Sequence, residues 1–411
     1  MQKAPLFVTK KELQITLFVL LALFLVSLSW EYYKFKKITT YSIYKDSFVV
    51  INSFDRVSKN GKIYKILKLK NSDFSFNGVY FKPIKIKRLD KVEAIFYTDK
   101  VTFYRFLKGF YAPLKTLQIK QNFTPSKIET IILNQHSSEI TKELYGALFF
   151  AMPLSKSLRE DIAKWGVSHL LAISGFHFGI IGGLLFLVLK LFYKFFQDRY
   201  FPYRNLNIDL GFLVLLLLGC YAFFIGFSPS VLRAFVMGLI GYFFYIKNIK
   251  IISFEALFIT ASAILIIEPR LLFSIAFWFS IGGVFYLFLF LYHFSNLSKT
   301  LQFILINFWV FFCMMPLVHY VFCTFSLYQF FSPFLSMAFV VFYPLSLALH
   351  VVGFGSLFDS LLIEFLKYNI ETSCIRTSVA FLAFYLILSI VAIRYKKLAF
   401  ILPFLGLCIF I

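Results

Sequence analysis

Charged residues are scarce in this chain. Of its 411 residues only 15% are charged, whereas 60% are hydrophobic and 21% are aromatic. Soluble domains average roughly 25% charged and 45 to 50% apolar residues, so the composition excludes an ordinary soluble protein. The sequence predicts an α-helical protein that crosses a membrane several times.

Cysteine is also scarce, and its spacing argues against two kinds of site. The chain has five cysteines and no Cys-x-x-Cys pair, which indicates neither a zinc site nor a disulfide framework. We expect them to pack between helices. They are Cys220, Cys313, Cys323, Cys374 and Cys408.

Catalytic motifs are missing as well. The sequence has no Gly-x-x-x-x-Gly-Lys-Ser/Thr loop, no His-Glu-x-x-His pair and no His-x-His-x-Asp-His cluster. These patterns would hold a nucleotide or a metal ion. We therefore expect no catalytic residues, no cofactor and no metal.

Long apolar runs are abundant. The first, Leu13 to Trp30, follows three lysines and has no small-residue cleavage site after it, so residues 1–30 are predicted to be a retained anchor helix. Further runs between His169 and Ile411 bring the expected total to about eight to eleven spans. The stretch Gly353–Arg376 is amphipathic and is expected to be interfacial or re-entrant.

A basic segment separates the anchor from the other spans. The formal net charge is +22, and residues 31–130 hold about 21 Lys and Arg against about 8 Asp and Glu. Alternating apolar and polar residues, broken by Asn, Gly, Asp and Ser turns, predict about five strands in residues 31–125. This pattern fits a small OB-like barrel, although an open sheet is an alternative.

Residues 126–168 have apolar positions among polar ones, which predicts two interfacial amphipathic helices. Lys and Arg cluster in alternate short loops after residue 169, and such loops face the cytoplasm. The N-terminus is then cytoplasmic and the β-domain periplasmic.

Lysines alternate with aromatic residues in the β-domain, a composition typical of proteins that bind single-stranded nucleic acid by charge and base stacking. Acidic lipid headgroups are a second partner for the same charge. Aromatic residues of a small barrel also commonly form its core. The candidate DNA-capture residues are Lys62, Lys65, Lys68, Lys70, Lys85, Lys87 and Arg88.

The segment His169–Gly179 places polar groups in a long apolar run. His169 and His177 fall within about 80° of each other on a helix, and Ser174-Gly175 is a natural break between them. Polar groups at membrane depth usually face a bundle interior or a watery path. The histidines therefore line a path or hydrogen-bond neighbouring helices. A hydrolase using Ser174 and His177 is a weaker alternative, because no acidic partner lies nearby.

Glycines repeat through the same helix. Gly175, Gly179 and Gly183 leave one face without side chains, which favours close packing, a dimer seam or a smooth pore wall.

The stretch Ser228–Arg233 reads as a helix start, with Ser228 as N-cap and Pro229 after it. Free amides and Arg233 would form an anion site there. An ion pair of Arg233 with Glu255 or Glu268 is the alternative.

Three stretches carry a resemblance: Tyr145–Ile181, Ser228–Ala234, and Glu268-Pro269 with Phe277–Gly283. They resemble the ComEC family of bacterial competence proteins, DNA-uptake channels of the inner membrane. Trp278 and Phe279 depart from the family's Gln and Leu, so no polar pore lining is carried over to Trp278.

The resemblance implies that residues 169–411 form a channel that passes single-stranded DNA from periplasm to cytoplasm during natural transformation, in a short form without the metallo-β-lactamase-like domain of many relatives. The expected channel residues are His169, Ser174, Gly175, His177, Gly179, Ser228 and Arg233.

The implied partners, besides DNA and lipid, are a periplasmic DNA receptor, a cytoplasmic helicase-like ATPase, single-strand-binding proteins and a second copy of the chain. A transporter of small anions or lipids is the alternative function, which internal inverted repeats would favour.

Overall fold

A computed structural model describes residues 6–7, 9–58, 61, 63–124, 126–226 and 229–408. The chain divides into two compact units. The sheet unit comprises Thr9–Lys127 and Ser262–Ser274, and the helical unit comprises Ile128–Ala261 and Ile275–Ile411, with the first eight residues. Each unit is described below by itself.

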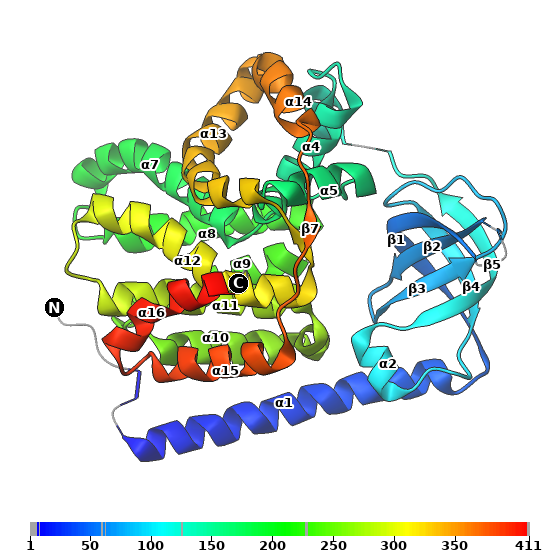
Figure 1. Ribbon diagram of the computed structural model, residues 1–411, viewed down its shortest axis with the longest axis horizontal. Coiled ribbons are helices and arrows are strands. Elements are labelled where there is room, and N and C mark those ends of the chain that lie inside the picture. Colours follow the sequence, from blue (N-terminus) through cyan, green and yellow to red (C-terminus); the bar gives the residue numbers. More distant parts are fainter. Residues whose placement is uncertain are drawn as a thin grey trace. The chain divides into compact units, whose positions relative to one another are not determined.

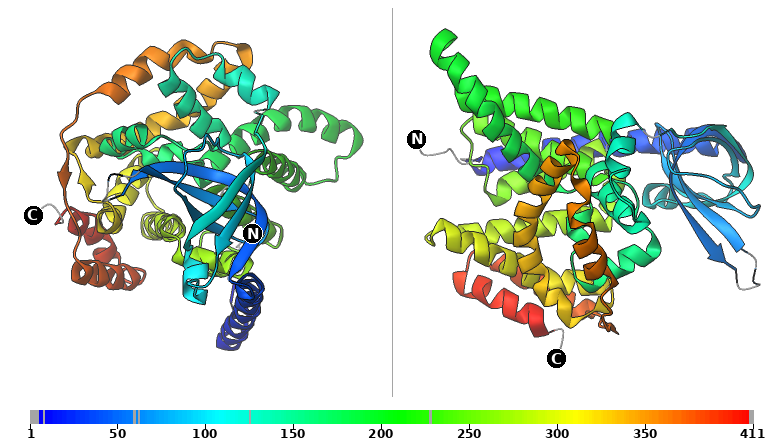
Figure 2. Two further views of the ribbon diagram at one scale, coloured as in Figure 1. Left: turned by 90° about the vertical axis from the view of Figure 1, so that its right-hand side faces the viewer. Right: turned by 90° about the horizontal axis from the view of Figure 1, so that it is seen from above.

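The sheet unit contains five strands in the order β1-β2-β3-β5-β4 (Figures 1 and 2). Strand β1 pairs with both β2 and β4, so the sheet closes on itself, and β3 pairs in parallel with β5. The elements of this unit are α1 (Lys10–Thr39), β1 (Ile43–Val57), β2 (Ile63–Lys70), β3 (Ser75–Tyr80), β4 (Lys91–Tyr97), α2 (Phe103–Lys108), β5 (Tyr111–Gln121) and the 3-10 helix η1 (Pro269–Phe273).

Alternation along the strands explains the core of the closed sheet. In β2, Leu67 and Leu69 are fully buried while Lys68 and Lys70 are exposed, because successive side chains point to opposite faces. The rings of Phe76 and Phe96 lie 4.3 Å apart, centroid to centroid. Six phenylalanines of the segment form the core: Phe48, Phe74, Phe76, Phe96, Phe106 and Phe110.

Helix α1 begins with a capping box between Thr9 and Glu12 and continues beyond the apolar run to Thr39, where Ile38 enters the core of the sheet unit. Glu31 is buried and pairs with Arg270 of η1 at 2.7 Å. The Arg270 guanidinium lies over the Phe106 ring, 4.4 Å from its centroid. These contacts explain why Ser262–Ser274 belongs with the sheet unit.

The helical unit is built from helices with short connections (Figure 1). Helix α12 packs against α11, α13 and α16, and α7 packs against α8 and α9. Its elements are α3 (Lys127–Leu133), α4 (Glu139–Phe150), α5 (Lys156–Lys164), α6 (Ser168–Leu171), α7 (Gly175–Tyr200), α8 (Leu206–Phe224), α9 (Pro229–Ile246), α10 (Phe254–Ile267), α11 (Ile275–His293), α12 (Lys299–Val321), β6 (Thr324–Phe325), η2 (Leu327–Phe331), α13 (Ser332–Val352), η3 (Gly355–Phe358), α14 (Asp359–Lys367), β7 (Ser373–Cys374), α15 (Val379–Val391) and α16 (Lys396–Leu407).

Among the described residues, six helices are long and apolar enough to cross a membrane: α1, α7, α8, α11, α12 and the stretch Leu327–Val352 that contains α13. Three shorter apolar helices, Ser230–Ile246, Phe254–Ile267 and Val379–Val391, coincide with further expected spans. The predicted class, a mostly helical membrane protein with a small β-sheet, is confirmed in this coarse form. The count of eight to eleven spans is reached only if the shorter helices are included.

Two segments were predicted to be amphipathic. Residues 126–168 contain three helices, α3, α4 and α5, and the first residue of α6, where two helices were expected, and residues 144–150 of α4 are buried inside the protein. The amphipathic stretch Gly353–Arg376 contains the short helix α14, whose apolar side packs against α4 and α5. In both places, neighbouring helices of the same chain cover the apolar face.

Candidate functional site

Helix α13 carries a buried face that is unusually polar for a membrane-spanning helix. Its buried positions recur every three or four residues, which places them on one side of the helix. Polar side chains on such a face lie inside a bundle because exposure to lipid would leave them without hydrogen bonds. The face consists of Ser332, Ser336, Phe339, Tyr343, Ser346 and His350.

His169 meets the first part of this face. Its Nε2 lies 3.2 Å from the Ser336 hydroxyl, and the Ser332 hydroxyl donates to the Gly166 carbonyl at 3.0 Å. The sequence left open whether His169 lines a path or bonds a neighbouring helix, and the structure provides the helix bond.

Ser174 and His177 form the amino-terminal cap of α7. The Ser174 hydroxyl accepts from the Phe176 amide, and the Ser174 amide donates to His177 Nδ1, both at 3.3 Å. The predicted helix break at Ser174-Gly175 is therefore present. Because Nδ1 accepts this bond, His177 is a neutral imidazole with its proton on Nε2.

The His177 ring packs edge-on against two residues of α13. Its centroid lies 5.2 Å from the Phe339 ring and 4.9 Å from the Tyr343 ring. The motif residues His169 and His177 therefore both contact the polar face of α13.

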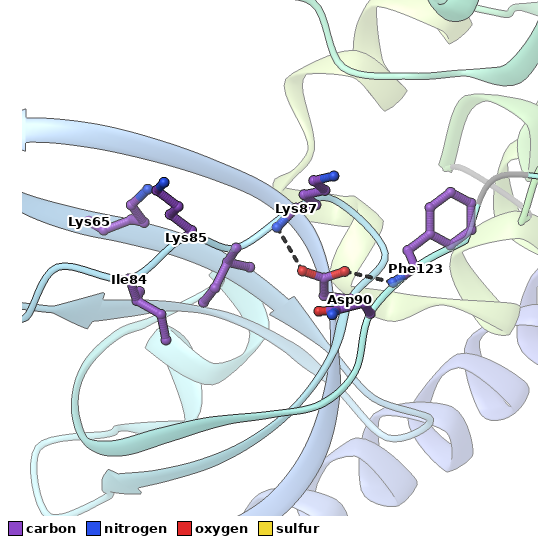
Figure 3. Close-up of a pocket in the computed structure, with 8 residues that line it drawn as sticks. Lys65, Ile84, Lys85, Lys87, Asp90 and Phe123 are labelled. Carbon is purple, nitrogen blue, oxygen red and sulfur yellow. Dashed lines mark hydrogen bonds between the residues drawn. The ribbon is translucent and has the colours of Figure 1, made fainter.

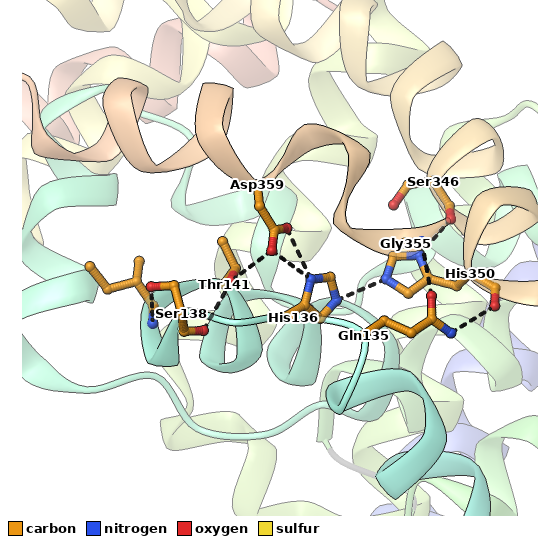
Figure 4. A network of polar contacts seen from close by, with 9 residues as sticks. Gln135, His136, Ser138, Thr141, Ser346, His350, Gly355 and Asp359 are labelled. Atoms are coloured by element: carbon orange, nitrogen blue, oxygen red, sulfur yellow. Dashed lines mark hydrogen bonds and ion pairs between the residues drawn. The ribbon is translucent and has the colours of Figure 1, made fainter. Parts of the chain in front are cut away.

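A second histidine cluster continues this face, and the sequence did not suggest it. His136 Nδ1 lies 2.9 Å from an Asp359 carboxylate oxygen, and its Nε2 lies 3.0 Å from His350 Nε2 (Figure 4). His350 Nδ1 lies 2.6 Å from the Ser346 carbonyl. Three segments, the α3–α4 connection, α13 and α14, thus meet through one buried network of hydrogen bonds.

The Ser346 carbonyl can only accept, so His350 Nδ1 donates in that bond. His136 continues the network from His350 Nε2 to the Asp359 carboxylate, and the tautomer of each ring sets which nitrogen donates in these two bonds.

Neighbouring groups hold the hydrogen-bond network of His136, His350 and Asp359 in place. The Tyr145 ring stacks on His136 with centroids 4.4 Å apart, and burial raises the pKa of Tyr145 to about 12, so it stays a neutral phenol. Gln135 accepts from the Gly355 amide at 2.9 Å and donates to the His350 carbonyl at 3.0 Å. Thr141 donates to Asp359 at 3.3 Å.

Some glycines of α7 pack against neighbouring helices and others do not. A Cβ at Gly182 would touch Leu218 of α8 at 3.4 Å, and one at Gly175 would touch Ala234 at 3.9 Å. A Cβ at Gly179 or Gly183 would meet nothing within 4 Å. The middle of the small-residue face is therefore open within the described part of the helical unit.

Helix α9 begins at Pro229 as predicted, and Arg233, one turn later, is buried with 6% of its surface exposed. Ser228 lies outside the described residues, so the proposed N-cap is not observed.

The closed sheet has a basic hollow on its surface (Figure 3). The Asp90 carboxylate accepts from the amides of Lys87 and Phe123, each at 2.7 Å, and so fixes the rim. The lining residues are Lys65, Ile84, Lys85, Ile86, Lys87, Asp90, Asn122 and Phe123. Three of the candidate capture residues thus surround one hollow.

A second hollow of the sheet is aromatic. Phe81 and Tyr111 are 63% and 65% exposed, and the Tyr64 ring lies 5.8 Å from Phe81. The lining residues are Arg56, Ser58, Tyr64, Ile66, Val79, Phe81 and Tyr111. Sequence reasoning missed Arg56 and Tyr111.

The remaining capture candidates are dispersed. Lys68 and Lys70 are exposed on β2, Arg88 is half-buried, and Lys62 lies outside the described residues. Lys65 pairs with Asp55 at 3.3 Å.

Comparisons with known proteins complete the description. A family model described as Competence protein matches residues 151–411. Recombination protein 2 of Haemophilus influenzae is 26% identical over 144 residues, 33% of this chain and 18% of that protein. The uncharacterized protein MG316 homolog of Mycoplasma pneumoniae is 31% identical over 157 residues, 38% of this chain and 37% of that protein. The aligned parts thus span less than two-fifths of either relative. No solved structure matches the chain.

Proposed function

Because the chain belongs to the competence protein family, we propose that it passes single-stranded DNA across the bacterial inner membrane during natural transformation. The family match covers more than half of the chain and supports a role in competence. It also confirms the resemblance of Tyr145–Ile181 and Ser228–Ala234, most of which lies within the matched residues.

The observation that carries the proposal is the polar face of α13 and its contacts with the start of α7. His169, Ser174 and His177 bring hydrogen-bonding groups and the capped start of α7 to this face in an otherwise apolar bundle. Such groups can replace water around a polar substrate inside a membrane. Gly179, whose Cβ side is open, leaves room beside them.

The closed sheet supplies the capture step in this proposal. Five strands, closure and the parallel β3–β5 pair favour an OB-like barrel. Exposed Phe81 and Tyr111, with the half-buried Tyr64 beside Phe81, offer faces on which bases stack. Lys65, Lys85 and Lys87 offer charge for phosphates. Proteins that bind single strands combine these two features.

In the proposed orientation the N-terminus is cytoplasmic and the sheet unit periplasmic, as the Lys and Arg bias of the short loops favours. The chain acts as a conduit and not as an enzyme, so a cytoplasmic ATPase supplies the force and a periplasmic receptor delivers the DNA. Single-strand-binding proteins receive the strand in the cytoplasm.

The path is tested by following labelled DNA in cells that lack the gene and carry wild type, His169→Ala or Arg233→Ala. We expect label to stop outside the inner membrane without the gene and with either variant. His293→Ala, a histidine that bonds the Ala392 carbonyl outside the proposed path, is the matched control. Normal entry of DNA without the gene overturns the channel and favours the transporter of small anions or lipids.

The capture step is tested by oligonucleotide binding to the full-length protein at several salt concentrations. Phe81→Ala should weaken binding at all salt concentrations, and Lys85→Ala should lower the slope of log affinity against log salt by about 0.7 per phosphate contact. Tyr41→Ala and Lys108→Ala, outside both hollows, are the controls. Binding that does not depend on salt would remove the capture step.

A further inference from the structure

The structure brings together two cysteines that lie far apart in the sequence. Strands β6 and β7 form a two-stranded antiparallel ribbon in which Thr324 pairs with Cys374 and Phe325 with Ser373. Cys323 lies directly before β6, and its carbonyl accepts from the Ile375 amide at 2.9 Å. Cys323 and Cys374 are therefore diagonal neighbours at the end of this ribbon.

The spacing of a ribbon suits a disulfide. Neighbouring strands about 4.8 Å apart with a rise of about 3.3 Å per residue put diagonal Cα atoms about 6 Å apart, within the range that disulfides span. In a regular ribbon these side chains would point to opposite faces. Cys323, however, lies between the end of α12 and the first ladder pair, and the Cys374 side chain is the main influence on the pKa of its thiol. The two side chains therefore lie near each other at the end of the ribbon.

The pair has the asymmetry that thiol exchange requires. The hydrogen bond from Cys374, together with the nearby Arg376 guanidinium, lowers the pKa of the Cys323 thiol. The same interaction raises the pKa of the Cys374 thiol. Cys374 is exposed and Cys323 is partly exposed, so an oxidant can reach them.

The location of the pair favours oxidation. Helix α12 begins at Lys299, and Arg394, Lys396 and Lys397 follow α15. Basic residues at these ends place them in the cytoplasm. The cysteines lie at the opposite ends of α12 and α15, and therefore on the outer side of the membrane, where disulfides form and persist.

We propose that Cys323 and Cys374 form a disulfide on the outer face of the membrane. The bond links the end of α12 to the segment before α15 and closes a loop that contains α13 and α14. These helices carry His350 and Asp359 of the buried hydrogen-bond network. Closing a long loop restricts the unfolded polypeptide, so the disulfide stabilises the part of the fold that holds this network in place. The inference does not depend on DNA being the substrate.

The oxidant is the disulfide of a thiol oxidoreductase. The Cys323 thiolate attacks one sulfur of that disulfide, forms a mixed disulfide and releases the oxidant's other sulfur as a thiolate. The Cys374 thiol loses its proton and attacks the Cys323 sulfur, which breaks the mixed disulfide and releases the second thiolate of the oxidant. Two thiols of the chain are oxidised, one disulfide of the oxidant is reduced to two thiols, and the two protons pass to the released sulfurs.

The test counts thiols in the full-length protein. Cells are quenched with acid, and the protein is denatured and alkylated without reductant, then again after reduction. We expect three of the five cysteines to react before reduction and all five after it. Mass spectrometry of the unreduced protein should find the peptides of Cys323 and Cys374 joined. Alkylation of all five cysteines before reduction overturns the proposal.

Single variants identify the pair. Cys323→Ser and Cys374→Ser should each leave four of four cysteines reactive, whereas Cys220→Ser, an exposed cysteine elsewhere, should leave two of four. If Cys323→Ser still protects two cysteines, a different pair is linked and the proposal is wrong. The joined peptide in the wild-type protein needs no variant and decides the matter if a variant fails to accumulate.

Discussion

The sheet unit and the helical unit bury opposite kinds of side chain. In the closed sheet, the fully buried residues include Phe48, Phe76 and Phe96, while lysines cover the surface. In the helical unit, Leu191 and Val351 are 75% and 81% exposed, while His136, Ser346 and Asp359 are buried. In the sheet unit, apolar side chains are buried because this removes them from water. In the helical unit, apolar side chains can stay on the surface because lipid is as apolar as they are.

This difference changes where the candidate functional residues lie. In the sheet unit the candidates are surface residues, such as Phe81 and Lys85, that do not contribute to the core. In the helical unit they are interior residues, because a polar group in contact with lipid has no partner. The following variants test this comparison, from the largest expected effect to the smallest.

Asp359→Ala should destabilise the helical unit most. It leaves His136 buried beside a vacant acceptor site, and breaking a buried pair costs about 3–5 kcal/mol. Asp359→Asn should be much milder because its side-chain amide can still hydrogen-bond His136 Nδ1. The thermal midpoints of the purified proteins compare the two variants. Equal midpoints for Ala and Asn would show that this hydrogen bond does not stabilise the helical unit.

Phe76→Ala should destabilise the sheet unit by a comparable amount, about 3–5 kcal/mol, because it opens a cavity among stacked rings. Phe81→Ala should stay within about 0.5 kcal/mol of wild type, since its ring is exposed. Limited proteolysis of the full-length protein between residues 31 and 125 measures both. If Phe81→Ala is as sensitive as Phe76→Ala, Phe81 is a core residue and not a free stacking surface.

Gly355→Ala should destabilise by about 1–3 kcal/mol through overpacking. Its Cβ would lie 2.4 Å from Gln135 Oε1 and 2.5 Å from the His350 ring. Gly179→Ala should leave stability unchanged or slightly raised, because its Cβ meets open space and alanine favours a helix. Thermal midpoints distinguish the two glycines. A destabilised Gly179→Ala would mean that another chain packs on this face.

The smallest effect is expected at Glu93 of β4. Hydrogen bonds from Lys120, at 2.7 Å, and from Lys45 lower the pKa of Glu93 from its ordinary value of 4.5. A lowered pKa means that the stabilisation is present above pH 4.5 and is lost as the pH falls through the lowered pKa. The Glu93→Gln variant should therefore be slightly less stable than wild type at neutral pH, and its stability should fall less steeply than that of wild type as the pH is lowered into the acid range. Parallel acid titration curves for wild type and Glu93→Gln would contradict this assignment.

The sequence predicted those structural features that depend on residues close together in the chain. Alternation in β2 indicated which residues face in and out, and Ser174-Gly175 indicated where α7 begins, because capping and strand alternation involve neighbouring residues. It also suggested Lys65, Lys85 and Lys87, although only the fold gathers them around one hollow.

By itself, the sequence determined the membrane class, the basic β-segment and the family motif, since composition, period and local spacing follow from the order of residues alone. Only the tertiary structure decided that His136 meets His350 and Asp359, and that Cys323 meets Cys374. These residues are widely separated in the chain, and no local period relates one to the other. Helix packing and one short ribbon bring them together, and that packing is a property of the whole fold.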